Sequence, residues 1–174
     1  MGMKNNRAML EQFIVDYKEN IYRLAYSYVH NKADALDIVQ ESIYKAMKTK
    51  SSLQDPGAMK SWFYRIVVHT ALDLLRKQKK VQPMEEEQLH AFMYQSEDAY
   101  ADVDIQQTLE QLPEKYRAVL VLRFFEDLTF EEVADVLREN INTVKTRLYQ
   151  ALKLLRIQME STAPERRREN GSTS

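Results

Sequence analysis

Apolar residues recur along this chain at the three- and four-residue spacing of an amphipathic helix. The first such run has its apolar positions at Leu10, Phe13, Ile14, Tyr17, Ile21, Leu24, Ala25 and Tyr28. After a break at Asn31 and Lys32, the same spacing predicts helices over residues 34–48 and 59–79, separated by the turn-rich segment SSLQDPG. The side chains that we expect to face inward on these two helices are Leu36, Val39, Ile43 and Met47, then Phe63, Val67, Thr70 and Leu74.

A second helical block begins near Val103, and its predicted helices run over residues 104–111, 113–125, 130–138 and 143–159. Thr129 and Glu132 have the spacing of a capping box at the start of the third of these helices. A turn of about four residues follows, and we expect Asn142 to cap the last helix. This layout is typical of a helix-turn-helix. The last helix is expected to bury Val144, Leu148, Ala151, Leu152 and Leu155.

Charge is segregated along the chain, although the formal net charge is only −1. Residues 60–80 hold six cations against one acid, residues 85–104 hold seven acids and no Lys or Arg, and residues 138–157 hold five cations against one acid. Basic patches favour a polyanionic partner, and the acidic run disfavours compaction. We therefore expect an all-α protein with two small helical domains, residues 1–83 and 103–160, the second containing the helix-turn-helix. A flexible acidic linker is expected over 84–102 and a disordered tail over 161–174.

Composition excludes several function classes. The chain has no cysteine, which excludes disulfides, thiolate metal sites and cysteine nucleophiles, and its three histidines lie far apart. No glycine lies between Ala58 and Asn170, which excludes glycine-rich phosphate loops. No nucleophile–base pair can be assembled, so we expect neither an enzyme nor a bound cofactor. No apolar run approaches the roughly 20 residues that span a bilayer, and no signal peptide is visible, so we expect a cytoplasmic protein without membrane insertion.

The last predicted helix could read DNA. Its polar side carries amides, hydroxyls and a lysine, which can contact base edges in a major groove, and cations that can contact phosphates flank it. The polar side presents Asn142, Thr146, Tyr149, Gln150 and Lys153, and the flanking cations are Lys145, Arg147 and Arg156. The alternative is an ordinary solvated helix face.

The helix over residues 59–79 carries a second candidate surface. One stripe of it combines a tryptophan with several cations, the two features that single-stranded nucleic acid requires. This stripe contains Trp62, Arg65, His69, Asp73, Arg76 and Lys80. The alternative is that Trp62 packs as a core or boundary residue.

The helix over residues 34–48 carries the third candidate surface. Asp34, Asp37 and Glu41 line its outer side with Ile38 among them, and Tyr44 lies near the edge. An exposed aliphatic residue within an acidic stripe would fit a basic, partly apolar protein partner. The alternative is that the acids only favour the helix N-terminus electrostatically.

Short motifs lie on all three surfaces in a fixed order. They are Asp34-Ala35-x-Asp37-x-x-Gln40-Glu41, then Trp62-x-x-Arg65-Ile66 with Asp73-x-x-Arg76, then Leu112-Pro113 with Arg117, Glu132 with Ala134, and Thr143-Val144-Lys145-x-Arg147-Leu148. Together, from about Tyr17 to Leu155, the chain resembles a bacterial sigma factor of the extracytoplasmic-function (ECF) group. It departs from that pattern at Arg138, where the turn usually has Gly, and at His69, where the family usually has Asn.

The resemblance implies a transcription factor that binds RNA polymerase core and directs it to promoter DNA without covalent chemistry. The polymerase-binding residues would be Asp34, Asp37, Ile38, Gln40 and Glu41. The residues that read the upstream (−35) element as duplex would be Asn142, Thr143, Lys145, Thr146, Arg147, Tyr149, Gln150 and Lys153. The residues that capture the separated non-template strand of the downstream (−10) element would be Trp62, Arg65, Arg76 and Lys77. An anti-sigma factor, often membrane-bound, is a further implied partner that would hold the protein at the membrane.

Two other classes remain open. A helix-turn-helix regulator would bind a palindromic site as a dimer and would have no affinity for polymerase core. A helical adaptor that binds only proteins would make no phosphate contacts, which the segregated cations argue against.

Overall fold

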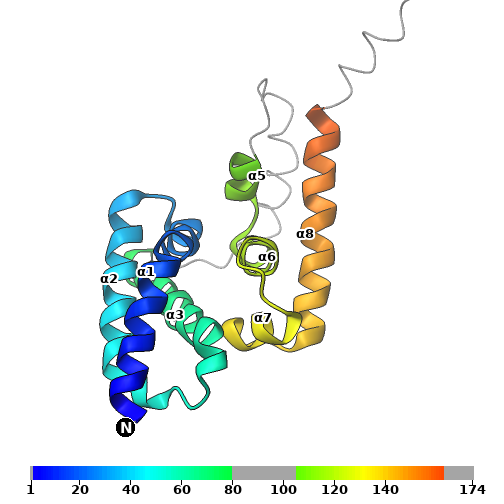
Figure 1. Ribbon diagram of the computed structural model, residues 1–174. Coiled ribbons are helices and arrows are strands. Elements are labelled where there is room, and N and C mark those ends of the chain that lie inside the picture. The colour runs from blue at the N-terminus through cyan, green and yellow to red at the C-terminus, as the bar shows by residue number, and fades with distance from the viewer. Residues whose placement is uncertain (1, 80–104, 163–174) are drawn as a thin grey trace, which may run out of the picture.

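The structure is a computed structural model that describes residues 2–79 and 105–162. Three long helices form the N-terminal domain: α1 (Gly2–Val29), α2 (Lys32–Thr49) and α3 (Met59–Lys79). Each packs against the other two (Figure 1). Two short 3-10 turns, η1 (Lys50–Ser52) and η2 (Pro56–Ala58), connect α2 to α3. The predicted bounds of α3 are therefore correct, and α2 begins two residues earlier than expected because Asn31 caps it, accepting from the Asp34 amide at 2.8 Å.

The predicted inward face of α2 is wrong by one residue. The helix buries Ala35, Ile38, Ser42 and Ala46, with Val39, Ile43 and Met47 only partly buried behind them. Leu36, expected inward, is 42% exposed. Three of these four buried side chains are small, and a pattern weighted toward large apolar residues does not detect a stripe of small residues. On α3, Phe63, Val67 and Thr70 are buried as expected, and Leu74 is half-buried.

The C-terminal domain consists of α5 (Ile105–Gln111), α6 (Glu114–Leu120), the π-helical turn η4 (Val121–Phe125), α7 (Phe130–Leu137) and α8 (Ile141–Thr162). The capping box of Thr129 and Glu132 is confirmed. On α8, Val144, Leu148 and Ala151 are buried and Leu155 is half-buried, but Leu152 is 44% exposed, against expectation.

The start of α8 also differs from the prediction. The carboxamide oxygen of Asn140, not of Asn142, caps the helix, accepting from the Asn142 amide at 2.8 Å. Arg138 lies in the left-handed region at φ 53°, ψ 45°. Its amide bonds to the Asp135 carbonyl and the Glu139 amide to the Ala134 carbonyl, which is the Schellman arrangement that usually has glycine at this position. The helix-turn-helix therefore forms with arginine in the strained position.

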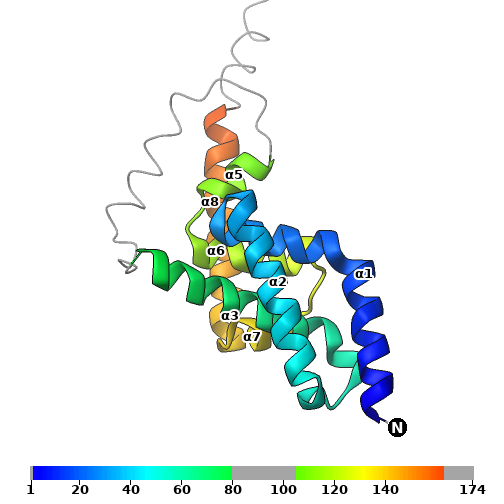
Figure 2. The same ribbon diagram turned by 90° about the vertical axis from the view of Figure 1, so that its left-hand side faces the viewer.

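The two domains pack directly on each other, which the sequence pattern did not predict. α7 lies along α3, and α6 with η4 contacts α1 (Figures 1 and 2). Helix α8 packs on α6 and α7, and so lies one helix away from α3. The predicted linker over 84–102 lies outside the described residues. Of the disordered tail predicted over 161–174, the first two residues instead complete α8, and residues 163–174 lie outside the described residues.

Candidate nucleic-acid and polymerase interfaces

The side of α8 opposite its buried stripe is open to solvent. Tyr149 is 70% exposed. The other exposed residues of this face are Asn142, Lys145, Thr146, Gln150 and Lys153, and Thr143 is half-buried at its edge. The Thr146 hydroxyl donates to the Asn142 carbonyl at 2.9 Å, so its oxygen remains available as an acceptor. The face thus presents amides, a hydroxyl and cations on a rigid helix.

Arg147 is less accessible than its neighbours. Its guanidinium pairs with Glu139 at 3.1 Å, and its side chain is only 25% exposed. The pair fixes Arg147 beside a shallow hollow whose lining includes Lys115 and Tyr116 of α6 as well as Asn142, Thr143, Thr146 and Gln150. Lys115 therefore adds a cation that sequence reasoning missed. Its position two residues after Pro113 gave no signal that it would lie beside α8.

On α3, the predicted strand-capture residues do not form one continuous open surface. Trp62 is half-buried, packs against the core and donates its Nε1–H to the Ser52 hydroxyl at 3.1 Å. Arg76 and Lys77, toward the end of the helix, are exposed. The tryptophan is therefore partly packed in the domain and partly open to solvent, which fits both a boundary residue and a stacking residue.

The middle of this α3 stripe faces α7. Arg65 forms an ion pair with Asp135 at 3.4 Å. Partial burial lowers the pKa of His69, and the nearby guanidinium groups of Arg138 and Arg65 lower it further. The C-terminal domain therefore covers part of the surface that the sequence assigned to strand capture.

On α2, Asp37, Gln40 and Glu41 are exposed, as expected of a docking face. The carboxylate of Asp34 accepts hydrogen bonds from the side chains of Asn31 and of Gln78 on α3. These two hydrogen bonds, the one from Asn31 most strongly, lower the pKa of the Asp34 carboxyl group. The expectation for Ile38 is wrong: it is 1% exposed and belongs to the core, because the whole buried stripe is shifted by one residue.

A groove between α2 and α3 adjoins this acidic face. Asp37 and Glu41 line it from α2, and Asp73 and Lys77 line it from α3. Lys45 closes its floor by donating to the Thr70 hydroxyl at 3.1 Å. The aliphatic and aromatic groups that α2 exposes are Leu36 and Tyr44, in place of Ile38. The helix thus still combines acids with exposed apolar surface.

Within residues 2–79 and 105–162, no three His, Asp or Glu side chains are grouped so that they could hold a metal ion. In the same part of the chain, no helix is both long enough and apolar enough to cross a membrane.

Comparison with known proteins identifies both domains. Residues 13–81 match the family model of sigma-70 region 2, and residues 102–155 match that of sigma-70 region 4. The RNA polymerase sigma factor SigV of Bacillus subtilis is 51% identical over 90% of this chain and 94% of its own length. The ECF RNA polymerase sigma factor SigW of the same organism is 32% identical over 84% and 87%.

Solved structures share the fold. CnrH, in complex with the cytosolic domain of CnrY, aligns with a TM-score of 0.66 at 21% identity, over 91% of this chain and 92% of that one. The sigma factor RpoE of Bartonella quintana, in complex with the anti-sigma factor NepR, aligns with a TM-score of 0.68 at 18% identity, over 86% and 96%. The similarity to SigV and SigW does not favour a dimeric regulator without polymerase binding. The chain belongs to the ECF sigma factors, the alternative sigma factors that direct RNA polymerase core to specific promoters.

Proposed function

We propose that three surfaces of this chain divide the work of promoter recognition. The acidic face of α2 docks on polymerase core, α8 reads the upstream element as duplex, and α3 captures the separated non-template strand of the downstream element. The observation that carries the proposal is α8 itself: one side is sealed in the core by Val144, Leu148 and Ala151, and the opposite side presents polar and cationic groups to solvent. Major-groove recognition requires such a face.

Binding energy, without covalent chemistry, drives strand separation in this proposal. An unstacked base that packs on an aromatic side chain contributes about 1–3 kcal/mol. Trp62 supplies the aromatic surface, and the exposed cations Arg76 and Lys77 lie farther along the same helix. Arg147 and Lys115 hold phosphates of the upstream duplex beside the α8 hollow.

An anti-sigma factor is the second partner that we propose. Support comes from the structural neighbour that was solved with the anti-sigma factor NepR. The α2 face and its groove are the surface such a protein would cover, because covering them prevents docking on core. The chain would act in the cytoplasm, and a membrane-anchored anti-sigma factor would hold it at the membrane.

Charge reversal on α2 tests the docking surface. Replacing Asp37 and Glu41 with lysine should weaken binding to core polymerase by about thirtyfold, or about 2 kcal/mol, because like charges then meet the basic partner. The matched control is Glu11→Lys, at an exposed acid on α1 that forms an ion pair with Arg7. Fluorescence anisotropy with purified core enzyme gives both affinities. Equal affinity of the double variant and the control would refute docking through this face.

A further inference from the structure

The only tryptophan of the chain is hydrogen-bonded to the turn that follows α2. Trp62 lies on α3, and its indole Nε1–H donates to the Ser52 hydroxyl at 3.1 Å. The same hydroxyl donates its proton to the carbonyl oxygen of Thr49 at 2.6 Å. Thr49 is the last residue of α2, and Ser52 ends the η1 turn after it. These hydrogen bonds therefore connect the ring of Trp62 to the C-terminus of α2.

The Ser52 hydroxyl is oriented for both contacts at once. A hydroxyl has one proton and two lone pairs, so the proton that goes to Thr49 leaves a lone pair for the indole N–H. The carbonyls of the last turn of an α-helix have no partner within the helix, and Thr49 supplies one of them. The turn itself therefore fixes the orientation in which Ser52 accepts from Trp62.

Packing alone holds only part of the Trp62 ring. The side chain is half-buried, so one portion contacts the core and the rest is open to solvent. The χ2 torsion of tryptophan has broad minima, and a partly packed ring can therefore swing. The indole N–H lies in the plane of the ring. A hydrogen bond to Ser52 thus limits this rotation without covering either face of the ring.

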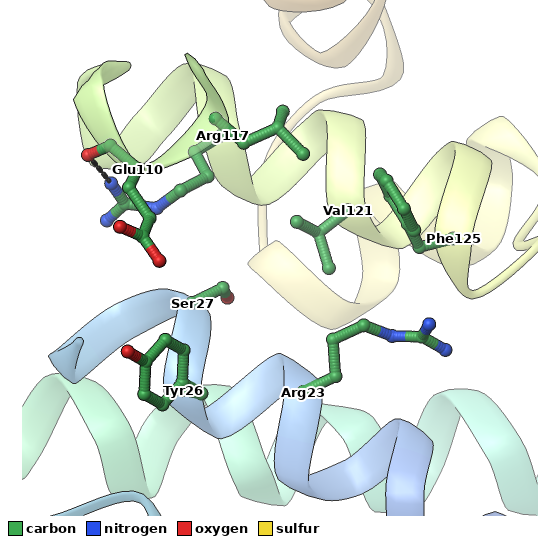
Figure 3. A pocket seen from close by; sticks show the side chains of 8 residues that line it. Arg23, Tyr26, Ser27, Glu110, Arg117, Val121 and Phe125 are labelled. Carbon is green, nitrogen blue, oxygen red and sulfur yellow. Dashed lines mark hydrogen bonds between the residues drawn. The ribbon is translucent and has the colours of Figure 1, made fainter. Parts of the chain in front are cut away.

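The open surface of Trp62 also differs from that of other exposed rings. Figure 3 shows Arg23 of α1 opposite Phe125 of η4 across a cleft, and the guanidinium lies 5.6 Å from the centre of that ring. On α2, the ammonium group of Lys48 lies 4.6 Å from the Tyr44 ring centre. Within residues 2–79 and 105–162, no cation is placed over Trp62 in this way. Its exposed surface therefore remains free for a base.

We propose that Ser52 is a positioning residue for strand capture: by accepting the Trp62 N–H, it holds the indole so that its open surface meets an unstacked base. A ring that is already held loses less conformational freedom when a base packs on it. Because Ser52 follows α2 so closely, the same bond also fixes Trp62 relative to the helix with the docking face. The effect on capture rests on the proposed function of Trp62; the position of the ring in the free chain does not.

Ring motion in the free, full-length chain tests the positioning directly. Because Trp62 is the only tryptophan, time-resolved fluorescence anisotropy under selective excitation reports its motion alone. Ser52→Ala should raise the amplitude of fast ring motion about twofold, since only packing then holds the ring. Ser52→Thr keeps the hydroxyl and should resemble wild type. Ser51→Ala makes the same chemical change at the exposed neighbouring serine and is the matched control.

The anisotropy result decides the first half of the proposal. A folded Ser52→Ala chain with the ring motion of Ser51→Ala would overturn it. Circular dichroism first shows that each variant is folded. If Ser52→Ala is not, Ser52→Thr and Ser52→Val decide instead, because these two variants match in shape and differ in the hydroxyl group.

A double-mutant cycle in the holoenzyme tests the effect on capture. Ser52→Ala should lower the ratio of open to closed promoter complexes about threefold, because the hydrogen bond lies near the surface and one exposed bond contributes little. Ser52→Thr should restore the ratio. Phenylalanine at position 62 keeps an aromatic ring but has no N–H, so in a Trp62→Phe chain the Ser52→Ala change should have no further effect.

The cycle separates positioning from a role in the turn alone. A threefold loss from Ser52→Ala in both backgrounds would show that Ser52 does not act through the indole N–H, and would overturn its positioning role. If the Trp62→Ala holoenzyme instead opens promoters as wild type does, the strand-capture function proposed for Trp62 fails. The anisotropy result on the position of the ring would then still stand.

Discussion

At the scale of single residues, His69 reports how closely the two domains meet. The charged groups that act on its ring are Arg138 of the helix-turn-helix and Arg65, Asp73 and Arg76 of α3. Partial burial and the surrounding arginines lower its pKa below the ordinary value, and only Asp73 acts in the opposite direction. The folded chain therefore binds a proton at His69 less readily than the unfolded chain does.

The lowered pKa of His69 predicts that the folded chain loses stability at acidic pH. Because the pKa of His69 is lower in the folded state, its contribution to stability is lost as the pH falls through the unfolded value of about 6.5 and below it. Between about pH 7.5 and pH 5.5, wild type should lose more thermal stability than His69→Gln, which does not titrate there. Thermal melts followed by circular dichroism at several pH values give the comparison. Parallel pH profiles for the two chains would show that His69 does not carry the effect.

Ser42 offers a second prediction at this scale. It is fully buried on α2, and its hydroxyl has no hydrogen-bond partner among the described residues. A buried hydroxyl without a partner is costly, and alanine is the better helix former. Ser42→Ala should raise the free energy of unfolding by about 1 kcal/mol. Chemical denaturation measures it, and a loss of stability would mean that the hydroxyl has a partner.

At the scale of elements, the sequence was informative wherever the signal was local. The bounds of α3 and the capping box of α7 follow from residues that lie close together in the chain. Which face of α2 is buried could not be predicted in this way, because small residues such as Ala35 and Ala46 define its buried stripe. The same one-residue shift misplaced Ile38 among the docking residues, although Asp37 and Glu41 were correctly expected to be exposed.

The turn between α7 and α8 gives a testable prediction about stability. Arg138 occupies the left-handed region, where a side chain costs roughly 1–2 kcal/mol and glycine has no steric cost. Arg138→Gly should therefore stabilise the chain by about 0.5–1 kcal/mol, after the larger entropy of unfolded glycine is subtracted. Urea denaturation measures the change. Destabilisation would show that the arginine side chain makes a contact worth more than the strain.

At the scale of the whole molecule, the relative position of the two domains could not be read from the sequence. Glu126 accepts hydrogen bonds from Tyr64, which is 62 residues away in the sequence, and from Asn20, which is 106 residues away. No periodicity or short motif encodes a contact over such separations. The same packing places Arg65 against Asp135, so a residue that the sequence indicated as a candidate for DNA binding forms an ion pair within the protein. By contrast, each of the three candidate surfaces could be predicted from the sequence pattern of its own helix.

The division of labour between α8 and α3 is the central claim, and two substitutions separate its halves. Arg147→Ala should weaken binding to the upstream duplex by about 1–3 kcal/mol, and a template that is already melted downstream should remain usable. Trp62→Ala should have the opposite effect: duplex binding persists and the open complex fails to accumulate. Circular-dichroism melts must first show that Trp62→Ala is folded, because the ring also packs against the core.

Permanganate footprinting of thymines in the downstream element, with core polymerase and each purified chain, is the most direct measurement. We expect reactive thymines with wild type. With folded Trp62→Ala, we expect few reactive thymines despite normal upstream binding. With Arg147→Ala, we expect few reactive thymines on the duplex promoter, and we expect transcript formation to recover on a pre-melted template. A folded Trp62→Ala chain that opens the promoter as wild type does, together with an Arg147→Ala chain that binds the upstream element normally, would contradict the account.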